Sequence, residues 1–535
     1  MAAVLLCAAA VAACSSSNTT STSTNSSGSS STSSAAATSG PQNTAVPQAG
    51  GSFTMLEETG LTGAWPTGLD PATDASGSAN QSYLDAIYGN LFELGASGQT
   101  IDDLATGYTI SPDDKTVTIE LRHGVTFSDR TPFNAAAVAF NFKRDLTAPV
   151  GDTPKWPVSS ITTSGSYDVV IHLTQPYAPL INTFHDANVN WIVSPTALSK
   201  MGENAFKLAP VGAGPFTVVS DTVSSELALK KNPRYWAPGE PYLNTLTFKS
   251  VASDEAALET MQAGGVQGYE GMQTPQLVNA FAQQFNVLDV PSTSPYVIQL
   301  NTATAPFNNL AAREAVYYAT DVPVIDEKLF GNLHPVTEGF TAPNGLFYEQ
   351  DVPGYRTYNL ARAQAAVKAA GGVTVDLMAT QSSVTQTVLE ALQTMWQAAG
   401  MKVTIHVDQL PSVIQQFESK TWQASLQTAG AFDPAAGLGV NFRFGSASIF
   451  SGVHDPALDK IFANATSTLN TASRQTLYDQ AAEYISTNAY APFLFPVNGW
   501  NIAAKDVAGP GLTTLIPASA VRPEILWAQV GFTSK

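Results

Sequence analysis

A strand–helix–strand pattern near residue 390 constrains the fold more than any other stretch of this chain. Residues 373–378 and 403–407 have the composition of buried strands, and residues 386–399 have helical apolar spacing. The apolar stripe of this helix is Val388, Leu392, Met395 and Ala399, and Gly400 stands where a helix end favours a left-handed residue. Because the three elements follow one another within about 35 residues, they predict a right-handed parallel βαβ unit. The fold class is therefore expected to be α/β.

Local signals predict further helices and strands. Apolar and polar residues alternate over Thr116–Arg122 and again over residues 166–174, which indicates two half-buried strands. Asn134 is a good N-cap for a helix that runs to Arg144. Asp455, followed by proline, is the expected N-cap of a helix that begins near residue 457. Helices and strands are thus mixed along the chain, and no internal repeat is evident.

The first 52 residues have a different composition from the rest. An alanine-rich apolar run ends at Ala13, Cys14 follows, and residues 15–40 are almost entirely Ser, Thr, Asn, Gly and Ala. The apolar run is shorter than the ~20 residues that cross a bilayer, so it fits a signal segment better than a membrane span. Small residues followed by cysteine resemble a bacterial lipobox. We expect a signal peptide at 1–13 and a lipidated Cys14 with a disordered tether at 14–52, the alternative being a chance alanine-rich terminus.

Composition excludes several functions. The chain has 535 residues and a net charge of −18, which argues against nucleic acid and against adhesion to anionic lipid. Both cysteines, Cys7 and Cys14, lie in the terminal segment, so thiol catalysis and thiolate metal sites are not expected in the body. The residues that follow the signal peptide and tether are too many for one core, so two or three domains are expected.

Motifs for catalysis or cofactor binding are not found. The sequence has no His-Glu-x-x-His, Gly-x-Ser-x-Gly or phosphate-binding Gly-x-x-x-x-Gly-Lys-Ser/Thr pattern. None of the six histidines lies three or four residues from another, so none forms a helical metal pair. A serine hydrolase triad leaves no local signature, but no nucleophile stands out. We therefore predict a protein that is not an enzyme, with no catalytic residue, no metal and no cofactor.

A series of motifs from about residue 53 to 505 resembles the extracellular solute-binding proteins of ABC transporters, family 5, the oligopeptide, dipeptide and nickel-binding group. The motifs that carry the resemblance are 88–93, 104–105, 111–125, 131–135, 211–216, 232–236, 241–243, 254–256 and 261–264 in the first half, and 300–302, 306–307, 313–315, 319–321, 396–400 and 455–459 in the second. They occur in the family's order over nearly all of the chain.

The resemblance implies a two-lobed, periplasmic-binding-protein-like fold with an extra subdomain on lobe one. Lobe one is expected at 53–83, 211–297 and 496–535, the extra subdomain at 84–210, and lobe two at 298–495. It also implies a monomeric receptor, lipid-anchored on the outer side of the cytoplasmic membrane. The lobes would close around a ligand by a hinge motion and deliver it to the membrane subunits of an ABC permease.

One segment departs from the peptide-binding members. In those proteins an acidic residue before an Asp/Glu-Pro pair receives the amine of the peptide. Here residues 427–434 are shortened: Asp433 and Pro434 match the pair, but the separate amine-binding acid is missing. Peptides stay the leading ligand class, with sugars, opine-like conjugates, siderophores and metal chelates as alternatives. A bare metal ion is not expected because a histidine cluster is missing. Two alternative functions remain. One is an envelope sensor or adhesion protein of the same fold, and the other is a lipid-anchored hydrolase.

The resemblance also suggests where ligand-binding residues lie. The candidates follow the first strand, the two crossovers between the lobes and lobe two: Thr59, Trp65, Tyr296, Asn301, Trp422, Phe432, Asp433, Arg443 and Trp500. Asp433 is expected to meet a cationic group, Arg443 to pair with a carboxylate, and the rings to pack against the ligand. The alternative is a core position for each aromatic residue and a surface salt bridge for Arg443.

Overall fold

The computed structural model describes residues 45–58, 65, 67–74, 80–95, 98–150, 153–382, 384–437, 439–496, 498–512 and 524–533. All of them belong to one compact unit, Ala37–Lys535. The predicted signal peptide, Cys14 and most of the tether lie outside the described residues. Within the described ranges, no helix combines the length and the apolar character that crossing a bilayer requires.

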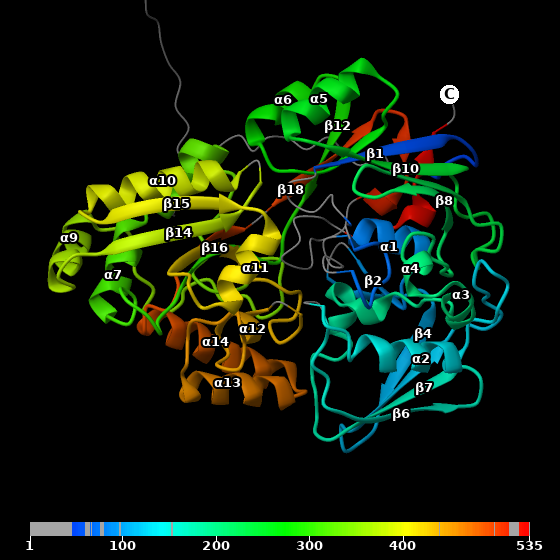
Figure 1. The fold of residues 1–535 in the computed structure, drawn as a ribbon, viewed down its shortest axis with the longest axis horizontal. Helices are drawn as coiled ribbons and strands as arrows, with labels where there is room; N and C mark the ends of the chain where they lie inside the picture. The colour runs from blue at the N-terminus through cyan, green and yellow to red at the C-terminus, as the bar shows by residue number, and fades with distance from the viewer. Residues whose placement is uncertain are drawn as a thin grey trace, which may run out of the picture. The chain divides into compact units, whose positions relative to one another are not determined.

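A seven-stranded sheet forms the framework of the expected lobe one (Figure 1). Its strands, in spatial order, are β12 (Phe285–Val290), β18 (Gly499–Ala504), β11 (Gly268–Met272), β1 (Ser52–Glu58), β10 (Thr245–Val251), β9 (Glu226–Lys231) and β8 (Phe216–Thr222). β1 pairs in parallel with both β10 and β11. Alternation along β1 sends Phe53 and Met55 into one core and Leu56 into another, so both faces of the sheet are buried.

Helices cover both faces of this sheet. The core that contains Phe53 also takes residues of α1 (Gln81–Tyr88), α3 (Pro195–Met201) and α4 (Glu203–Phe206), whereas α5 (Asp254–Ala263) and α6 (Val278–Ala282) pack with Leu56. The C-terminal segment adds a short pair, β19 (Val507–Ala508) with β20 (Gly531–Phe532). Side chains of α1 are buried along its whole length, so this helix is an interior element rather than a surface one.

A four-stranded antiparallel sheet, β4-β5-β7-β6, belongs to the expected extra subdomain. The strands are β4 (Ala105–Ile110), β5 (Thr116–Leu121), β6 (Val158–Ser164) and β7 (Asp168–Leu173). A separate antiparallel pair, β2 (Phe92–Leu94) and β3 (Thr100–Asp102), directly precedes β4 in the sequence. α2 (Ala135–Asp145) packs on the four-stranded sheet, and the Asn134 side chain accepts from the Ala137 amide. The strands predicted at 116–122 and 166–174 and the helix predicted from Asn134 are confirmed.

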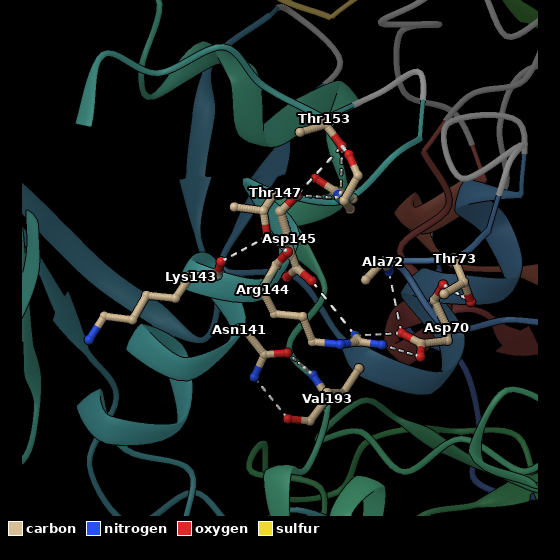
Figure 2. A network of polar contacts seen from close by, with 12 residues as sticks. Asp70, Ala72, Thr73, Asn141, Lys143, Arg144, Asp145, Thr147, Thr153 and Val193 are labelled. Carbon is tan, nitrogen blue, oxygen red and sulfur yellow. Dashed lines mark hydrogen bonds and ion pairs between the residues drawn. The ribbon is translucent and has the colours of Figure 1, made fainter. Parts of the chain in front are cut away.

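Arg144, at the end of α2, ties this part of the chain to the segment after β1. Its Nη1 donates to Asp70 Oδ1 at 2.7 Å, and Nη2 contacts Oδ2 of the same carboxylate (Figure 2). One turn earlier, the Asn141 amide exchanges two hydrogen bonds of 3.0 Å with the backbone of Val193. Because the Asp70 side chain is buried, the bidentate pair is held in one geometry.

The five-stranded sheet contains the βαβ unit. Its order is β15 (Lys402–Asp408), β14 (Thr374–Thr380), β16 (Ala424–Thr428), β13 (Pro295–Leu300) and β17 (Phe493–Pro496). β14 and β15 are parallel and are joined by α10 (Thr385–Ala398), as predicted, and Gly400 has a φ of +92°. The buried stripe of α10 is Val388, Leu389, Leu392 and Trp396, whereas the predicted Met395 is only partly buried. Trp396 takes the interior position, where its Nε1 donates to Thr320 Oγ1 at 3.0 Å.

Helices also cover both faces of the five-stranded sheet. α7 (Leu310–Ala319), α9 (Leu360–Ala369) and α10 form one large core with the strands, and the short α8 (Val322–Ile325) continues from α7. On the other face lie α11 (Leu410–Glu418), α12 (Val440–Phe444), α13 (Pro456–Ser467) and α14 (Thr471–Thr487). Asp455 caps α13 by accepting from the amides of residues 457 and 458, as its sequence position predicts.

Candidate ligand-binding site

Two short crossovers join the sheets and define the candidate site. The chain leaves β12 at Val290 and enters β13 at Pro295, and it returns from β17 at Pro496 to β18 at Gly499. The crossovers are linked by a 2.8 Å hydrogen bond from the Ser292 amide to Asn498 Oδ1. The carboxyl ends of the parallel strands β1, β11, β14 and β16 are the other candidate surfaces, because ligands of α/β proteins bind beyond such ends.

A small cavity lies against the crossovers. It is lined by Gln273, Tyr296, Phe330, His334, Val384, Phe495, Pro496 and Asn498, which come from β13, β17, the crossover before β18, the residue after β11, and helix ends with the loops beside them. Tyr296 is buried and packs edge-to-face on Phe495 at 5.8 Å between ring centroids. Of the predicted ligand residues, Tyr296 is therefore placed directly at the crossover.

Asn301 lies beyond the opposite end of β13. With a rise of ~3.3 Å per residue, the five residues from Tyr296 to Asn301 span roughly 17 Å. Its side chain donates to the Trp422 carbonyl at 2.9 Å and accepts from the Ala303 amide at 3.2 Å. Asn301 and Trp422 are thus brought together, away from the crossover.

Trp422 forms one wall of a separate pocket of about 170 Å³. Asp376, His406 and Asp408 are among the other lining residues, which come from β14, β15, α11 and the loop that leads into β16. The indole is buried against Phe417, with 4.9 Å between ring centroids, and its Nε1 has no hydrogen-bond partner.

The two other predicted tryptophans are packed into lobe-one cores, and Thr59 lies outside the described residues. Trp65 packs on Tyr83 at 4.8 Å and donates from Nε1 to Asp221 Oδ1 at 2.8 Å. Trp500 is buried among residues of β1, β11 and β12 and of α5 and α6. Both side chains stabilise the fold in this conformation through apolar burial.

Asp433 is fully occupied by partners within the chain. Arg474 of α14 binds it bidentately, with Nη1–Oδ2 at 2.9 Å and Nη2–Oδ1 at 2.8 Å. Oδ2 also accepts from Asn182 at 2.9 Å, and Oδ1 accepts from the Ala435 amide at 3.0 Å. The cation that the structure places on Asp433 is therefore Arg474.

The segment around Asp433 also contacts residues that belong to the expected extra subdomain. Phe432 is buried and meets the His185 ring edge-to-face at 5.4 Å, and the Ala178 amide donates to the Thr466 carbonyl at 2.8 Å. Burial lowers the pKa of His185 to about 3, so this ring is neutral near pH 7. These contacts, with the bond between Asn182 and Asp433, join residues 178–185 to the expected lobe two.

Arg443 is a buried cation for which the described residues supply no anion. It lies on α12, is only 5% exposed, and its Nε has no hydrogen-bond partner. None of the hydrogen bonds or ion pairs among the described residues involves its guanidinium. Burial lowers the pKa of Arg443 to about 10, which leaves the group charged at neutral pH. The alternative of a surface salt bridge for Arg443 is therefore not seen in the described part of the chain.

A hydrogen bond from Gln299 fixes the backbone of Arg443. Gln299 of β13 donates from Nε2 to the carbonyls of Arg443 and Phe450, at 2.7 and 2.8 Å, while its own Oε1 is buried without a partner. Ser425 stands opposite Gln299 on β16 and accepts from Gln427 at 2.7 Å. Sequence reasoning missed this polar patch because Gln299 and Ser425 meet only through the pairing of β13 with β16, 126 residues apart in the chain.

Comparisons with known proteins agree with this architecture. A family model described as bacterial extracellular solute-binding proteins, family 5, middle region, matches residues 99–448. The glutathione-binding protein GsiB of Escherichia coli O1:K1 / APEC is 28% identical over 454 residues, which cover 82% of this chain and 84% of GsiB.

Solved structures show the same fold at lower identity. The binding protein DppA of Helicobacter pylori, in complex with the peptide STSA, has a TM-score of 0.77 and 20% identity, over 91% of this chain and 99% of DppA. AgaA from A. tumefaciens R10, in complex with agropinic acid, has a TM-score of 0.76 and 20% identity over the same shares. The fold is thus the mixed α/β fold of the two-lobed periplasmic binding proteins, as predicted. The chain belongs to the bacterial extracellular solute-binding proteins, family 5.

Proposed function

We propose that this protein is a receptor that captures a carboxylate-bearing solute, with oligopeptides as the leading class, and delivers it to an ABC importer. The observation that carries the proposal is Arg443. A charged guanidinium without a counter-ion in the protein interior is costly, and an anion from outside the chain removes that cost. The planar fork of arginine suits a carboxylate, which it binds through two parallel hydrogen bonds.

The arrangement of the crossovers supports a binding and release cycle. In the described part of the chain, residues 291–294 and residue 498 lie in the crossovers between the two large sheets, so few backbone torsions would have to change for the lobes to open. Residues 178–185 contact lobe two through Asp433 and Thr466, which would hold the closed form. Family and fold are those of transport-binding proteins and not of enzymes, which agrees with the absence of catalytic motifs in the sequence.

An opine-like conjugate is the second candidate solute. Asp433 is neutralised by Arg474, so lobe two offers no acid there for the amine of a peptide. An opine also carries carboxylates that Arg443 would bind, and AgaA was solved with such a compound. The remaining ligand classes, and a sensor or adhesion role, are not favoured by a particular observation.

Titration with short peptides tests the peptide assignment. We expect trialanine to bind the soluble body, residues 50–535, in a one-to-one complex, and trialanine amide to bind about 10- to 100-fold more weakly because it lacks the carboxylate. Isothermal titration calorimetry measures both affinities. Equal affinity for the acid and the amide would contradict the role of Arg443, and binding of agropinic acid with no binding of peptides would favour the second candidate.

Lipid anchoring at Cys14 is part of the same proposal. The apolar run, the small residues before Cys14 and the polar tract after it support an exported, lipid-modified protein held near the membrane by a flexible tether. The full chain is expected in the membrane fraction of a bacterial host, and a Cys14→Ala variant in the soluble or unprocessed fraction. Mass spectrometry of the N-terminal peptide checks the modification, and an unmodified Cys14 in the mature protein would refute it.

A further inference from the structure

A buried amide oxygen next to Arg443 has no donor among the described residues. Gln299 of β13 is buried, and its Oε1 has no hydrogen-bond partner. The amide nitrogen of the same side chain donates to the carbonyls of Arg443 and Phe450, at 2.7 and 2.8 Å. A buried acceptor that stays unpaired is costly, so Oε1 calls for a donor that the described part of the chain does not supply.

The surroundings fix the orientation of this amide. Both groups that Gln299 contacts through Nε2 are carbonyls, which only accept hydrogen bonds, so a flipped amide would bring its oxygen against two acceptors. The loop that carries Phe450 is held from a second side, because Lys420 Nζ donates to the carbonyls of Ile449 and Ser451, at 2.5 and 3.3 Å. Oε1 is therefore held in one place and cannot exchange roles with Nε2.

Arg443 has the complementary need. Its buried Nε lacks an acceptor, so no hydrogen bond joins this nitrogen to Oε1 of Gln299. The nitrogen and oxygen of one amide lie roughly 2.2 Å apart, which places Oε1 within about 5 Å of the Arg443 carbonyl. A buried acceptor without a donor and a buried cation without an anion thus occur on two residues that contact each other.

One chemical unit can satisfy both residues. A carboxylate pairs with the guanidinium, and an N–H on the neighbouring carbon atom donates to Oε1. The C-terminal residue of a peptide carries this unit, as does any N-acylated or N-alkylated α-amino acid that keeps an N–H. A carboxylate without such a donor would pair with Arg443 and still leave the Gln299 oxygen buried without a partner.

We propose that Gln299 determines the specificity of the solute site: its Oε1 accepts from an N–H next to the carboxylate that Arg443 binds. The inference rests on the proposed receptor function and deepens it by naming the recognised unit, an α-amino acid residue whose substituted nitrogen keeps its hydrogen. A site built to accept from an N–H rejects an analogue without it, because the buried acceptor then stays unpaired. Peptides that end in proline should therefore be poor ligands, since the proline nitrogen has no hydrogen.

The test compares trialanine with alanyl-alanyl-lactate, in which an ester oxygen replaces the last N–H. In calorimetric titrations of the wild-type soluble body, the ester should bind about 10- to 100-fold more weakly. Gln299→Met should abolish this difference, whereas a merely structural role of Gln299 would weaken both ligands and keep their ratio. Gln397→Met, an exposed change on α10, is the matched control. If the wild type binds trialanine and the ester equally well, the role of Gln299 is refuted while the receptor function stands.

A second measurement needs neither a peptide ligand nor a stable Gln299 variant. N-Acetylglycine carries the carboxylate and the adjacent N–H, and acetoxyacetate is its ester counterpart without the N–H. At equal millimolar concentration, N-acetylglycine should raise the Tm of the wild type more than acetoxyacetate does. Equal shifts, or no shift with either compound, would overturn the assignment. If trialanine fails to bind but N-acetylglycine is the stronger stabiliser, the peptide assignment is rejected and recognition by Gln299 stands.

Discussion

Replacement of Arg443 by methionine should abolish high-affinity binding while leaving the empty protein as stable as before, or more stable. Arg443 has no counter-ion among the described residues, so methionine removes a buried charge and keeps most of the side-chain volume. Apolar replacement of buried charges is often neutral or stabilising by ~1–4 kcal/mol. Loss of the carboxylate partner should cost ~3–4 kcal/mol of binding, or roughly 100- to 1,000-fold in Kd.

Two measurements separate these effects. Urea unfolding of the ligand-free proteins gives the free energy of unfolding, and calorimetric titration with trialanine gives the Kd. Arg234→Met is the control, because Arg234 is exposed and lies in lobe one. A strong loss of stability in Arg443→Met would mean that the guanidinium has a structural partner, and unchanged affinity would remove it from the binding site.

Replacement of Arg474 by methionine should have the opposite effect on stability. Arg474 is buried like Arg443, but it binds both oxygens of Asp433 and donates from Nε to the Ala465 carbonyl at 2.9 Å. Removal of one partner leaves a buried carboxylate without its cation, which typically costs 3–5 kcal/mol. For a chain of this size the loss should appear as a clear decrease in the urea midpoint.

The pair can be dissected by a double variant. Asp433→Leu combined with Arg474→Met should be more stable than Arg474→Met alone, because neither buried charge then lacks its partner. The double variant should still be less stable than the wild type, since Asp433 also accepts from Asn182 and Ala435 and leucine loses these hydrogen bonds. If Arg474→Met unfolds at the same urea concentration as the wild type, the ion pair is not the structural element described above.

Local signals in the sequence predicted the regular elements well. The βαβ unit, the Asn134 and Asp455 caps and the alternating strands depend on neighbours a few residues away, so their pattern is readable in one dimension. The buried stripe of α10 was predicted less accurately. The hydrogen-bond partner of the buried Trp396 is Thr320, which lies 76 residues earlier and gives no local signal.

The candidate site was harder to predict because its chemistry depends on distant partners. Asp433 looked available in the sequence, but Arg474 follows it 41 residues later and occupies both oxygens. No local pattern marks Arg443 as buried. The proposed roles of the nine predicted ligand residues stay predictions, including that of Thr59, which lies outside the described residues.

Mass spectrometry of the solute released from the denatured soluble body tests the central claim most directly. A receptor saturated at 100 times its Kd gains ~2.7 kcal/mol of stability, so a tightly bound solute should survive purification. We expect about one equivalent of a compound, or a mixture of peptides, that carries a carboxylate, and none from Arg443→Met. A neutral sugar as the bound species, or equal amounts of solute from both proteins, would contradict the account.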